Sequence, residues 1–185
     1  MNFKTQNLKL IIGIGNPSRK YKNTYHSVGL LFIDYLTKKI TPSNFHILAS
    51  EIFMNLSGDF VKSALKKYNA RPDQLLIIHD DADIEIGKYK LSFGRGSAGH
   101  KGVNSIIEKL ETKNFWRLRI GIRPTLENKT LNNKKREKAE TFVLKKISKK
   151  DKKILVNLFK KITALLFNTD TLSTKTVKLF SKEKD

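Results

Sequence analysis

An apolar run at residues 8–12 passes directly into a glycine-rich turn at residues 13–17, and this junction constrains the fold more than any other stretch. The next amphipathic segment begins just after His26, so the pattern predicts a buried strand whose polar turn delivers a histidine to a helix start. Pro17 forces the residue before it into extended backbone, so we expect the Asn16 side chain to project from a rigid corner. Asn16 then either orients a substrate or makes an ordinary Asx turn.

Further strands and helices follow in alternation. Residues 74–78 form a nearly continuous apolar run, typical of a central strand buried on both faces, and residues 87–93 and 116–122 alternate in polarity as half-buried strands do. Apolar residues spaced three and four apart predict helices near residues 27–39, 60–68, 103–110 and 154–166. A chain of 185 residues suffices for one well-filled core, so we expect a single domain over residues 1–185.

The segments between these elements carry weaker signals. We expect an irregular connection over residues 40–52, a mobile polar connection over residues 125–140 and a disordered tail over residues 181–185. Ser27 and Ser57 stand just before helical patterns, so we predict that both cap the helices that follow.

A cluster of ionisable residues, HDDAD at positions 79–83, ends the central apolar run, and open α/β sheets bind ligands at such strand ends. Three carboxylates within four positions make Mg²⁺ or Ca²⁺ one option, although the rest of a Ca²⁺ loop is missing. In the alternative, Asp80 is the first residue past the strand and holds a histidine in the right tautomer, while the other two carboxylates are solvated turn residues. The positive end of the helix that begins after His26 should lower the pKa of that imidazole and keep it neutral.

Basic residues and glycines surround the last two predicted strands. Lys88 and Lys90 lie on the polar face of one strand, and Arg117 and Arg119 on the polar face of the other. Two cations at fixed separation on neighbouring strands would bind a terminal phosphate, because arginine forks onto its oxygens. The loop at residues 94–102, which contains four glycines and leads into a helix, would attract a phosphate or an oxyanion.

The chain has 37 Lys and Arg against 17 Asp and Glu, a net charge of +20, so RNA or DNA is the simplest partner and a biased composition is the alternative. It has no cysteine, and its four histidines show no close pair at helical spacing, so we expect neither disulfides nor a metal site. No apolar run approaches the roughly 20 residues that span a bilayer, and residues 1–9 are too short and polar for a signal peptide, so we expect no membrane partner. A nucleotide site is disfavoured because Ser18 replaces the third glycine of GxGxxG and no P-loop is present.

Four ordered blocks make the chain resemble the bacterial-type peptidyl-tRNA hydrolases over residues 8–124, with a compatible C-terminal helix. The blocks read GIGNP followed by T-x-H-S-V-G, then FMNLSG, then HDDADIEIG, then GSAGHKG followed by RLRIGI. The resemblance implies an α/β fold, a single domain in which α-helices surround a twisted mixed β-sheet in three layers. It also implies a monomeric, metal-independent enzyme without a cofactor, located in the bacterial cytoplasm or, alternatively, in the mitochondrial matrix. Such enzymes hydrolyse the ester between a peptide and the terminal ribose of tRNA, which recycles chains dropped by the ribosome.

The same resemblance implies roles for individual residues. His26 would be the catalytic base, with Asp80 as its orienting carboxylate. Asn16 and Asn55 would align the peptide and the attacked carbonyl, although Asn55 lies where a capping or turn role is the alternative. Lys90 and Arg119 would clamp the 5′ phosphate at the tRNA acceptor stem. Tyr21, Phe53 and Met54 would line the groove, and His100 and Lys101 would border the peptide channel.

Departures from the family pattern motivate a second hypothesis. Tyr25-His26-Ser27 stands where the family commonly has Arg-His-Asn, and Lys101 replaces a substrate-contacting amide. The connection at residues 36–52 is shorter than usual and omits strand material at one edge of the sheet. The alternative is therefore a catalytically impaired derivative that acts as an RNA-binding protein, with salt-sensitive RNA binding and no ester cleavage. The basic C-terminal third is either a tRNA-facing surface or a solvated helix face.

Overall fold

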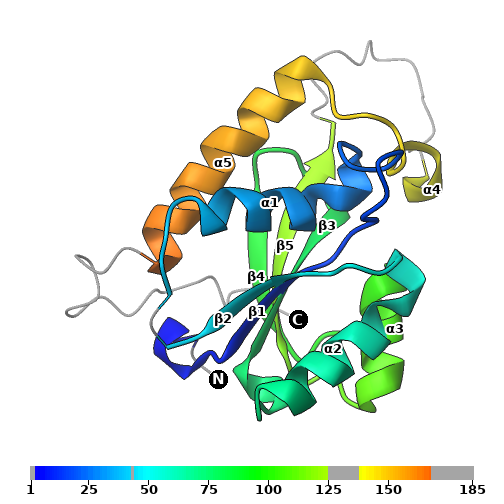
Figure 1. Cartoon of the computed structure of the whole chain (residues 1–185). Coiled ribbons are helices and arrows are strands. Elements are labelled where there is room, and N and C mark those ends of the chain that lie inside the picture. Colours follow the sequence, from blue (N-terminus) through cyan, green and yellow to red (C-terminus); the bar gives the residue numbers. More distant parts are fainter. Residues whose placement is uncertain (1–2, 43, 125–137, 168–185) are drawn as a thin grey trace, which may run out of the picture.

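The computed structural model describes residues 3–42, 44–124 and 138–167. Within these residues, five strands form one sheet in the order β2-β1-β3-β5-β4, in which β4 is antiparallel to β5 and every other pair is parallel (Figure 1). The α/β fold with a mixed sheet is therefore confirmed. The strands are β1 (Leu10–Gly13), β2 (His46–Ala49), β3 (Leu75–Glu85), β4 (Tyr89–Phe93) and β5 (Trp116–Arg123).

Helices cover both faces of the sheet, so the domain has three layers (Figure 1). On one face, α1 and α5 pack over a core that they share with β3 and β5, and on the other face α2 and α3 pack over a second core. The helices are α1 (Val28–Thr37), α2 (Ser57–Lys67), α3 (Lys101–Leu110), α4 (Ala139–Phe142) and α5 (Lys149–Phe167). Single 3₁₀ turns include η2 (Tyr25–Ser27) and η3 (Met54–Leu56).

The central strand β3 owes its position to the apolar run at its start. Leu76 and Ile78 are fully buried in the core under α1 and α5, while Leu75 and Ile77 are fully buried in the core under α2 and α3. A strand segment with both faces covered by a hydrophobic core is apolar at nearly every position, as this run is. The carboxyl half of β3 then carries its polar residues to the edge of both cores.

Gly29 allows the first helix to approach the sheet closely at this same edge. A Cβ atom at Gly29 would lie 2.3 Å from the Ile78 carbonyl oxygen and 2.5 Å from that of Ile14, so any side chain would push α1 away. Only glycine therefore lets the start of α1, with His26 just before it, sit directly against the end of the apolar run in β3.

Two predictions about strands were wrong. The connection expected to be irregular contains β2, which pairs in parallel with β1, although its residues are only half-buried or exposed. Strand β3 does not stop at Ile78 but continues through the acidic residues to Glu85. Asp80 is consequently a strand residue paired with Ile120 of β5, and not the first residue past the strand.

The predicted serine caps were also wrong. Ser27 and Ser57 do lie at the starts of α1 and α2, but neither side chain caps its helix. Ser27 Oγ instead donates to the Asn16 carbonyl oxygen at 3.3 Å, and Ser57 Oγ donates to the Met54 carbonyl oxygen at 2.8 Å. Both hydroxyls thus fasten a 3₁₀ turn or loop beside the polar strand end.

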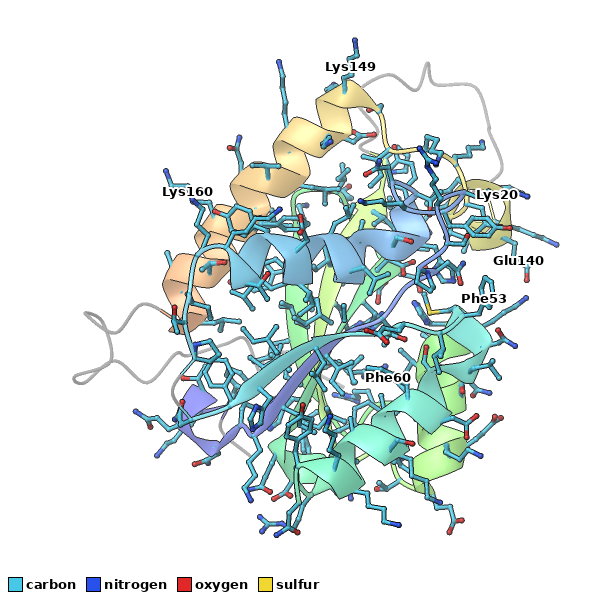
Figure 2. All side chains as sticks on the ribbon, viewed as in Figure 1. Lys20, Phe53, Phe60, Glu140, Lys149 and Lys160 are labelled. Atoms are coloured by element: carbon cyan, nitrogen blue, oxygen red, sulfur yellow. The ribbon has the colours of Figure 1, made fainter. Side chains whose placement is uncertain are left out.

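The C-terminal part contains the long amphipathic helix that the sequence predicts, α5. Lys149 and Lys160 project outward from it (Figure 2). Most of the connection expected over residues 125–140 and all of the tail expected over residues 181–185 lie outside the described residues, although α4 begins at Ala139. Among the described residues, no helix has both the length and the apolar character needed to cross a membrane.

Candidate active site

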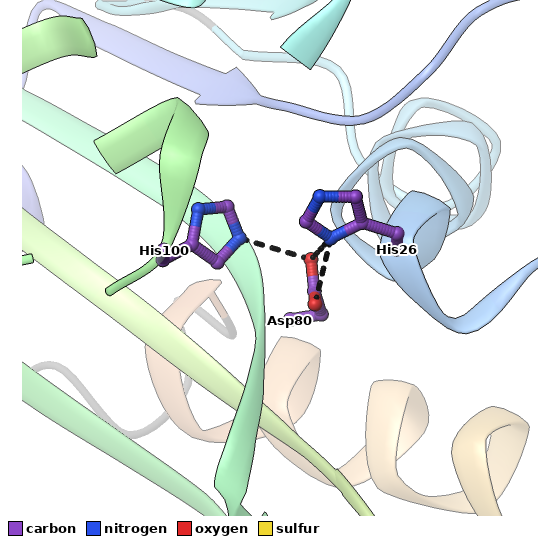
Figure 3. Close-up of side chains that lie close together, drawn as sticks. All are labelled: His26, Asp80 and His100. Carbon is purple, nitrogen blue, oxygen red and sulfur yellow. Dashed lines mark hydrogen bonds and ion pairs between the residues drawn. The ribbon is translucent and has the colours of Figure 1, made fainter. Parts of the chain in front are cut away.

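His26 and Asp80, which the family resemblance pairs as base and orienting carboxylate, lie in direct contact. The His26 Nδ1–H donates to both oxygens of Asp80 at 3.0 Å each (Figure 3). An ionised carboxylate only accepts hydrogen bonds, so the proton of the neutral imidazole resides on Nδ1. Nε2 of His26 therefore carries the lone pair of a base.

A second histidine, His100, binds the same carboxylate (Figure 3). Its Nε2 lies 3.1 Å from Asp80 Oδ1, and its Nδ1 accepts a hydrogen bond from the Val103 backbone N–H at 3.3 Å. Because Nδ1 is an acceptor here, the proton of His100 resides on Nε2 and points at Asp80. The N-terminus of α3 thus fixes the tautomer of His100, and the two rings donate to one carboxylate from opposite sides.

Electrostatics at this cluster differ from the sequence expectation. Burial alone would lower the pKa of His26, but the charge and hydrogen bonds of Asp80 raise it, so the net pKa lies above the ordinary value of 6.5. The predicted lowering by a helix dipole was wrong, because a full charge at 3.0 Å outweighs the partial charge at a helix end. Burial alone would raise the pKa of Asp80, yet the charges and hydrogen bonds of His100 and His26 hold it well below its usual range.

His26, Asp80 and His100 could also be considered as metal ligands, since one possible ligand atom from each lies within 4.8 Å of the others. The histidine spacing in the sequence missed this cluster, because its members come from η2, β3 and the start of α3. The hydrogen bonds fit a metal poorly. Each ring directs an N–H group at Asp80, whereas a metal ligand needs a lone pair there, and His100 already uses its lone pair to accept from Val103.

The cluster opens into a cavity of about 550 Å³. Asn16, Met54, Asn55 and Lys101, to which the family resemblance assigns substrate contacts, line this cavity together with His26 and His100. The buried Asn16 Oδ1 accepts from the Met54 backbone N–H at 3.0 Å, which leaves the Asn16 Nδ2 group as the donor that a ligand could meet. Asn55 and Lys101 are exposed at the cavity wall.

Two residues expected in the groove lie outside it. Of the residues that the structure describes, Tyr21 and Phe53 do not line this cavity. Phe53 is 51% exposed and projects into solvent just before η3 (Figure 2). Tyr21 is partly buried in the loop between β1 and η2. Any contact of these rings with a ligand would therefore be at the rim, outside the wall of the cavity.

The cationic pair expected to bind phosphate lies on neighbouring strands. Lys90 of β4 and Arg119 of β5 are register partners. Arg119 Nε donates to Asp81 Oδ2 at 2.7 Å, and Asp81 is buried, so the prediction that the second carboxylate is a solvated turn residue was wrong. Asp83 is exposed and forms an ion pair of 3.3 Å with Arg123.

Arg117 was also misplaced by the alternating pattern of β5. It is 2% exposed, and its Nε and Nη2 atoms have no hydrogen-bond partner among the described residues. Burial and the neighbouring charge of Arg119 lower its pKa to about 10. Only Arg119 of these two guanidinium groups reaches the surface.

A segment of the C-terminal third completes the site and was missed by the sequence reasoning. The backbone N–H of His26 donates to the Val143 carbonyl oxygen at 2.8 Å, and Thr24 pairs with Lys146 in an antiparallel bridge. Ala139, Glu140, Val143 and Leu144 line the cavity opposite α3. No local signal in residues 138–147 marks this role, because it depends on pairing with residues more than a hundred positions earlier.

Comparisons with known proteins agree with one another. The family model described as Peptidyl-tRNA hydrolase matches residues 10–184. The peptidyl-tRNA hydrolase of Aquifex aeolicus is 33% identical over 185 residues, which cover 90% of this chain and 92% of the relative. That of Mycoplasmopsis synoviae is 40% identical over 129 residues, which cover 62% of this chain and 69% of the relative.

Among solved structures, the peptidyl-tRNA hydrolase of Acinetobacter baumannii superimposes with a TM-score of 0.71 at 28% identity, covering 90% of this chain and 91% of that one. A [NiFe] hydrogenase maturation protease from Thermococcus kodakarensis shares only the fold, with a TM-score of 0.51 at 16% identity over 88% of this chain and 94% of that one.

Proposed function

Because this chain belongs to the peptidyl-tRNA hydrolase family and hydrolyses peptidyl-tRNA during translation, we propose that His26 is the general base of that hydrolysis. The single observation that carries the proposal is the hydrogen bond from His26 Nδ1–H to Asp80, which leaves Nε2 free to accept a proton at the cavity wall. A neutral histidine oriented by a carboxylate is suited to deprotonate water near neutral pH.

The proposed reaction is a two-step hydrolysis of the ester. Nε2 of His26 removes a proton from water, and the hydroxide oxygen forms a bond with the ester carbonyl carbon. The tetrahedral intermediate then expels the terminal ribose oxygen, which takes the proton back from Nε2, so tRNA and peptide are released. Asp80 stabilises the imidazolium that exists between these two transfers.

Amide donors would stabilise the negative charge on the carbonyl oxygen. Asn16 presents Nδ2 because its Oδ1 is held by the Met54 N–H, and Asn55 lies on the same cavity wall. One oxyanion donor of this kind contributes roughly 10²–10³ in kcat. The scheme uses only side chains of this chain and needs neither a metal nor a cofactor.

We assign the remaining predicted residues to binding. Lys90 and Arg119 lie on adjacent strands, and Asp81 orients Arg119. Together they would clamp the 5′ phosphate at the acceptor stem, because a guanidinium can form two parallel hydrogen bonds with phosphate oxygens and an ammonium adds a second positive charge. The peptide would lie in the cavity between α3 and α4, in contact with Met54, His100 and Lys101 and bordered at the rim by Phe53 and Tyr21.

The same proposal covers the state of the protein in the cell. We propose a single-domain monomer over residues 1–185 that acts in the bacterial cytoplasm, because its substrate arises on ribosomes there.

Release of free tRNA from an N-acetylated aminoacyl-tRNA tests the base assignment. We expect His26→Ala to lose roughly 10²–10⁴ of kcat while it still binds tRNA. His46→Ala is the matched control, because His46 lies on the edge strand β2 against Tyr68, away from the cavity. Turnover of His26→Ala at the wild-type rate would overturn the assignment.

A further inference from the structure

We propose that Tyr25 and Asp151 form a positioning pair that holds the turn carrying His26 against the first turn of α5. The Tyr25 hydroxyl donates to Asp151 Oδ2 at 2.5 Å, although the two residues are 126 positions apart in the chain. The inference rests on the proposed function, because it concerns the alignment of His26 as the base. Neither residue lines the cavity, so the pair acts through His26 and not on the substrate.

The pair belongs to a short seam between the catalytic turn and the segment before α5. The Tyr25 backbone N–H donates to the Lys145 carbonyl oxygen at 3.3 Å, the Ile147 N–H donates to the Asn23 carbonyl oxygen at 2.8 Å, and His26 N–H binds Val143. The Tyr25 ring also contacts Phe142 edge to face, with centroids 6.3 Å apart. The bond between the Tyr25 hydroxyl and Asp151 extends this seam from the backbone of residues 143–147 to the first turn of α5.

Asp151 is itself held firmly enough to serve as an anchor. It lies in the first turn of α5, where the helix dipole favours a negative charge, and its backbone N–H donates to Ser148 Oγ at 3.0 Å. Burial, followed by the hydrogen bond and charge of Asp151, raises the pKa of Tyr25 to about 12, although hydrogen bonds with Ser148 oppose this shift. The phenol therefore remains a donor across the pH range of an assay.

The geometry links this anchor to catalysis through one residue. The Tyr25 side chain and the His26 side chain leave adjacent positions of η2, one bound to α5 and the other to Asp80 on β3. The turn is thereby held from two sides, and loss of the α5 side would let the imidazole rotate away from Asp80. The direction in which Nε2 points into the cavity would then change, while strands β4 and β5, which we propose bind tRNA, would keep their positions.

Steady-state hydrolysis by single and double variants tests the pair. We expect Tyr25→Phe and Asp151→Ala each to lower kcat about fivefold to tenfold with KM within about twofold, less than the roughly 10–100-fold that a lost hydrogen bond to a charged group corresponds to, because the pair acts on His26 indirectly. The double variant should lose no more than Tyr25→Phe alone, because that change already removes the bond to Asp151 together with the contact of the hydroxyl with Ser148. Asp151→Asn, which keeps an acceptor oxygen, and Tyr25→Arg, which can form an ion pair with Asp151, should retain most of the activity.

Two further measurements separate positioning from general destabilisation. Tyr35→Phe is the matched control, because the Tyr35 ring packs against Phe159 of α5 and no hydrogen bond of its hydroxyl occurs among the described residues. In Tyr25→Phe, the pH at which kcat/KM is half-maximal should move down toward that of an ordinary histidine, since the contact with Asp80 weakens. The Tyr35→Phe profile should stay in place.

The outcomes distinguish this inference from the proposed function. Additive losses in the double variant, a rise in KM without a fall in kcat, or an unshifted pH profile in Tyr25→Phe would overturn the positioning pair and leave His26 as the base. Full turnover by His26→Ala would instead overturn the proposed function, whatever the behaviour of Tyr25.

Discussion

Asp80 and Asp81 are neighbours on β3 and are both buried, yet they hold different kinds of partner. Successive side chains on a strand project from opposite faces of the sheet. The Asp80 side chain therefore projects from the same face as Ile78, and the Asp81 side chain from the same face as Ile77. Asp80 accepts hydrogen bonds from two histidines, whereas Asp81 accepts one from Arg119. One peptide unit of the strand therefore separates two different electrostatic environments.

The chemistry of the partners explains what each carboxylate can do. A histidine gains and loses its proton near neutral pH, so the charge of Asp80 can govern a proton transfer. An arginine keeps its charge at every pH of interest, so Asp81 can only aim a permanent cation. If the two carboxylates have these separate roles, substitutions of Asp80 and its partners should change kcat, and substitutions of Asp81 and its partner should change KM.

Among the variants of the two carboxylates and of Arg119, Asp80→Asn should have the largest effect. The variant removes the charged acceptor that both His26 and His100 contact, and about 1.5–3 kcal/mol for one hydrogen bond to a charged group corresponds to roughly 10–100-fold in kcat. KM for an N-acetylated aminoacyl-tRNA should stay within about twofold of wild type. A melting curve checks that the buried amide is tolerated, and an unchanged kcat with a raised KM would contradict the comparison.

The next largest effect is expected on the other side of the strand, from Arg119→Gln. Loss of one charged contact to phosphate should raise KM roughly tenfold and leave kcat nearly unchanged. The slope of log KM against log salt should also fall by about one, because one fewer phosphate is neutralised. Arg119→Lys serves as the control, since it should restore the salt slope but only part of KM. A fall in kcat alone would show that the two sides are not separate.

Asp81→Asn should have a smaller effect of the same kind. Arg119 remains cationic but loses the charged acceptor that aims it, so we expect KM to rise about threefold with the salt slope intact. Steady-state titrations at several salt concentrations measure both quantities. An effect of Asp81→Asn on kcat as large as that of Asp80→Asn would remove the distinction between the two residues.

The smallest effect is expected on the pH dependence of kcat/KM. If His26 is the base, it must be neutral to accept a proton, and its pKa is raised above 6.5, so kcat/KM should increase with pH through a midpoint above 6.5. Burial and the charge of Lys101 lower that pKa, whereas Asp80 raises it, so the midpoint should move up in Lys101→Gln and down in Asp80→Asn. Lys113→Gln, an exposed lysine before β5, should leave it unchanged.

Local patterns were sufficient to predict the frame of the molecule. The apolar run that becomes the start of β3 and the glycine turn after β1 placed Asp80 after a buried run and His26 before a helix start, whereas the pairing of these two residues was implied by the family resemblance. The short strand β2 could not be predicted in this way, because its four residues are only partly covered and owe their conformation to pairing with β1. Sheet edges of this kind carry little periodicity.

Contacts across the chain account for what the sequence could not predict. Alternation placed Arg117 on a polar face but could not tell that this face is covered, so a buried guanidinium was expected to be exposed. Asp81 was expected in water because its partner Arg119 is 38 positions away on another strand. The direction of the pKa shift of His26 depended likewise on a distance to Asp80 that no local pattern contains.

The bridge between Thr24 and Lys146 also has a consequence for the order in which the enzyme is made. Ribosomes synthesise chains from the N-terminus, so His26, Asp80 and His100 emerge well before residues 143–147. A nascent chain that ends before Val143 lacks the acceptor for the His26 backbone and one wall of the cavity. The proposed catalytic centre can therefore be completed only near the end of synthesis, and truncated products should carry His26, Asp80 and His100 without a finished cavity.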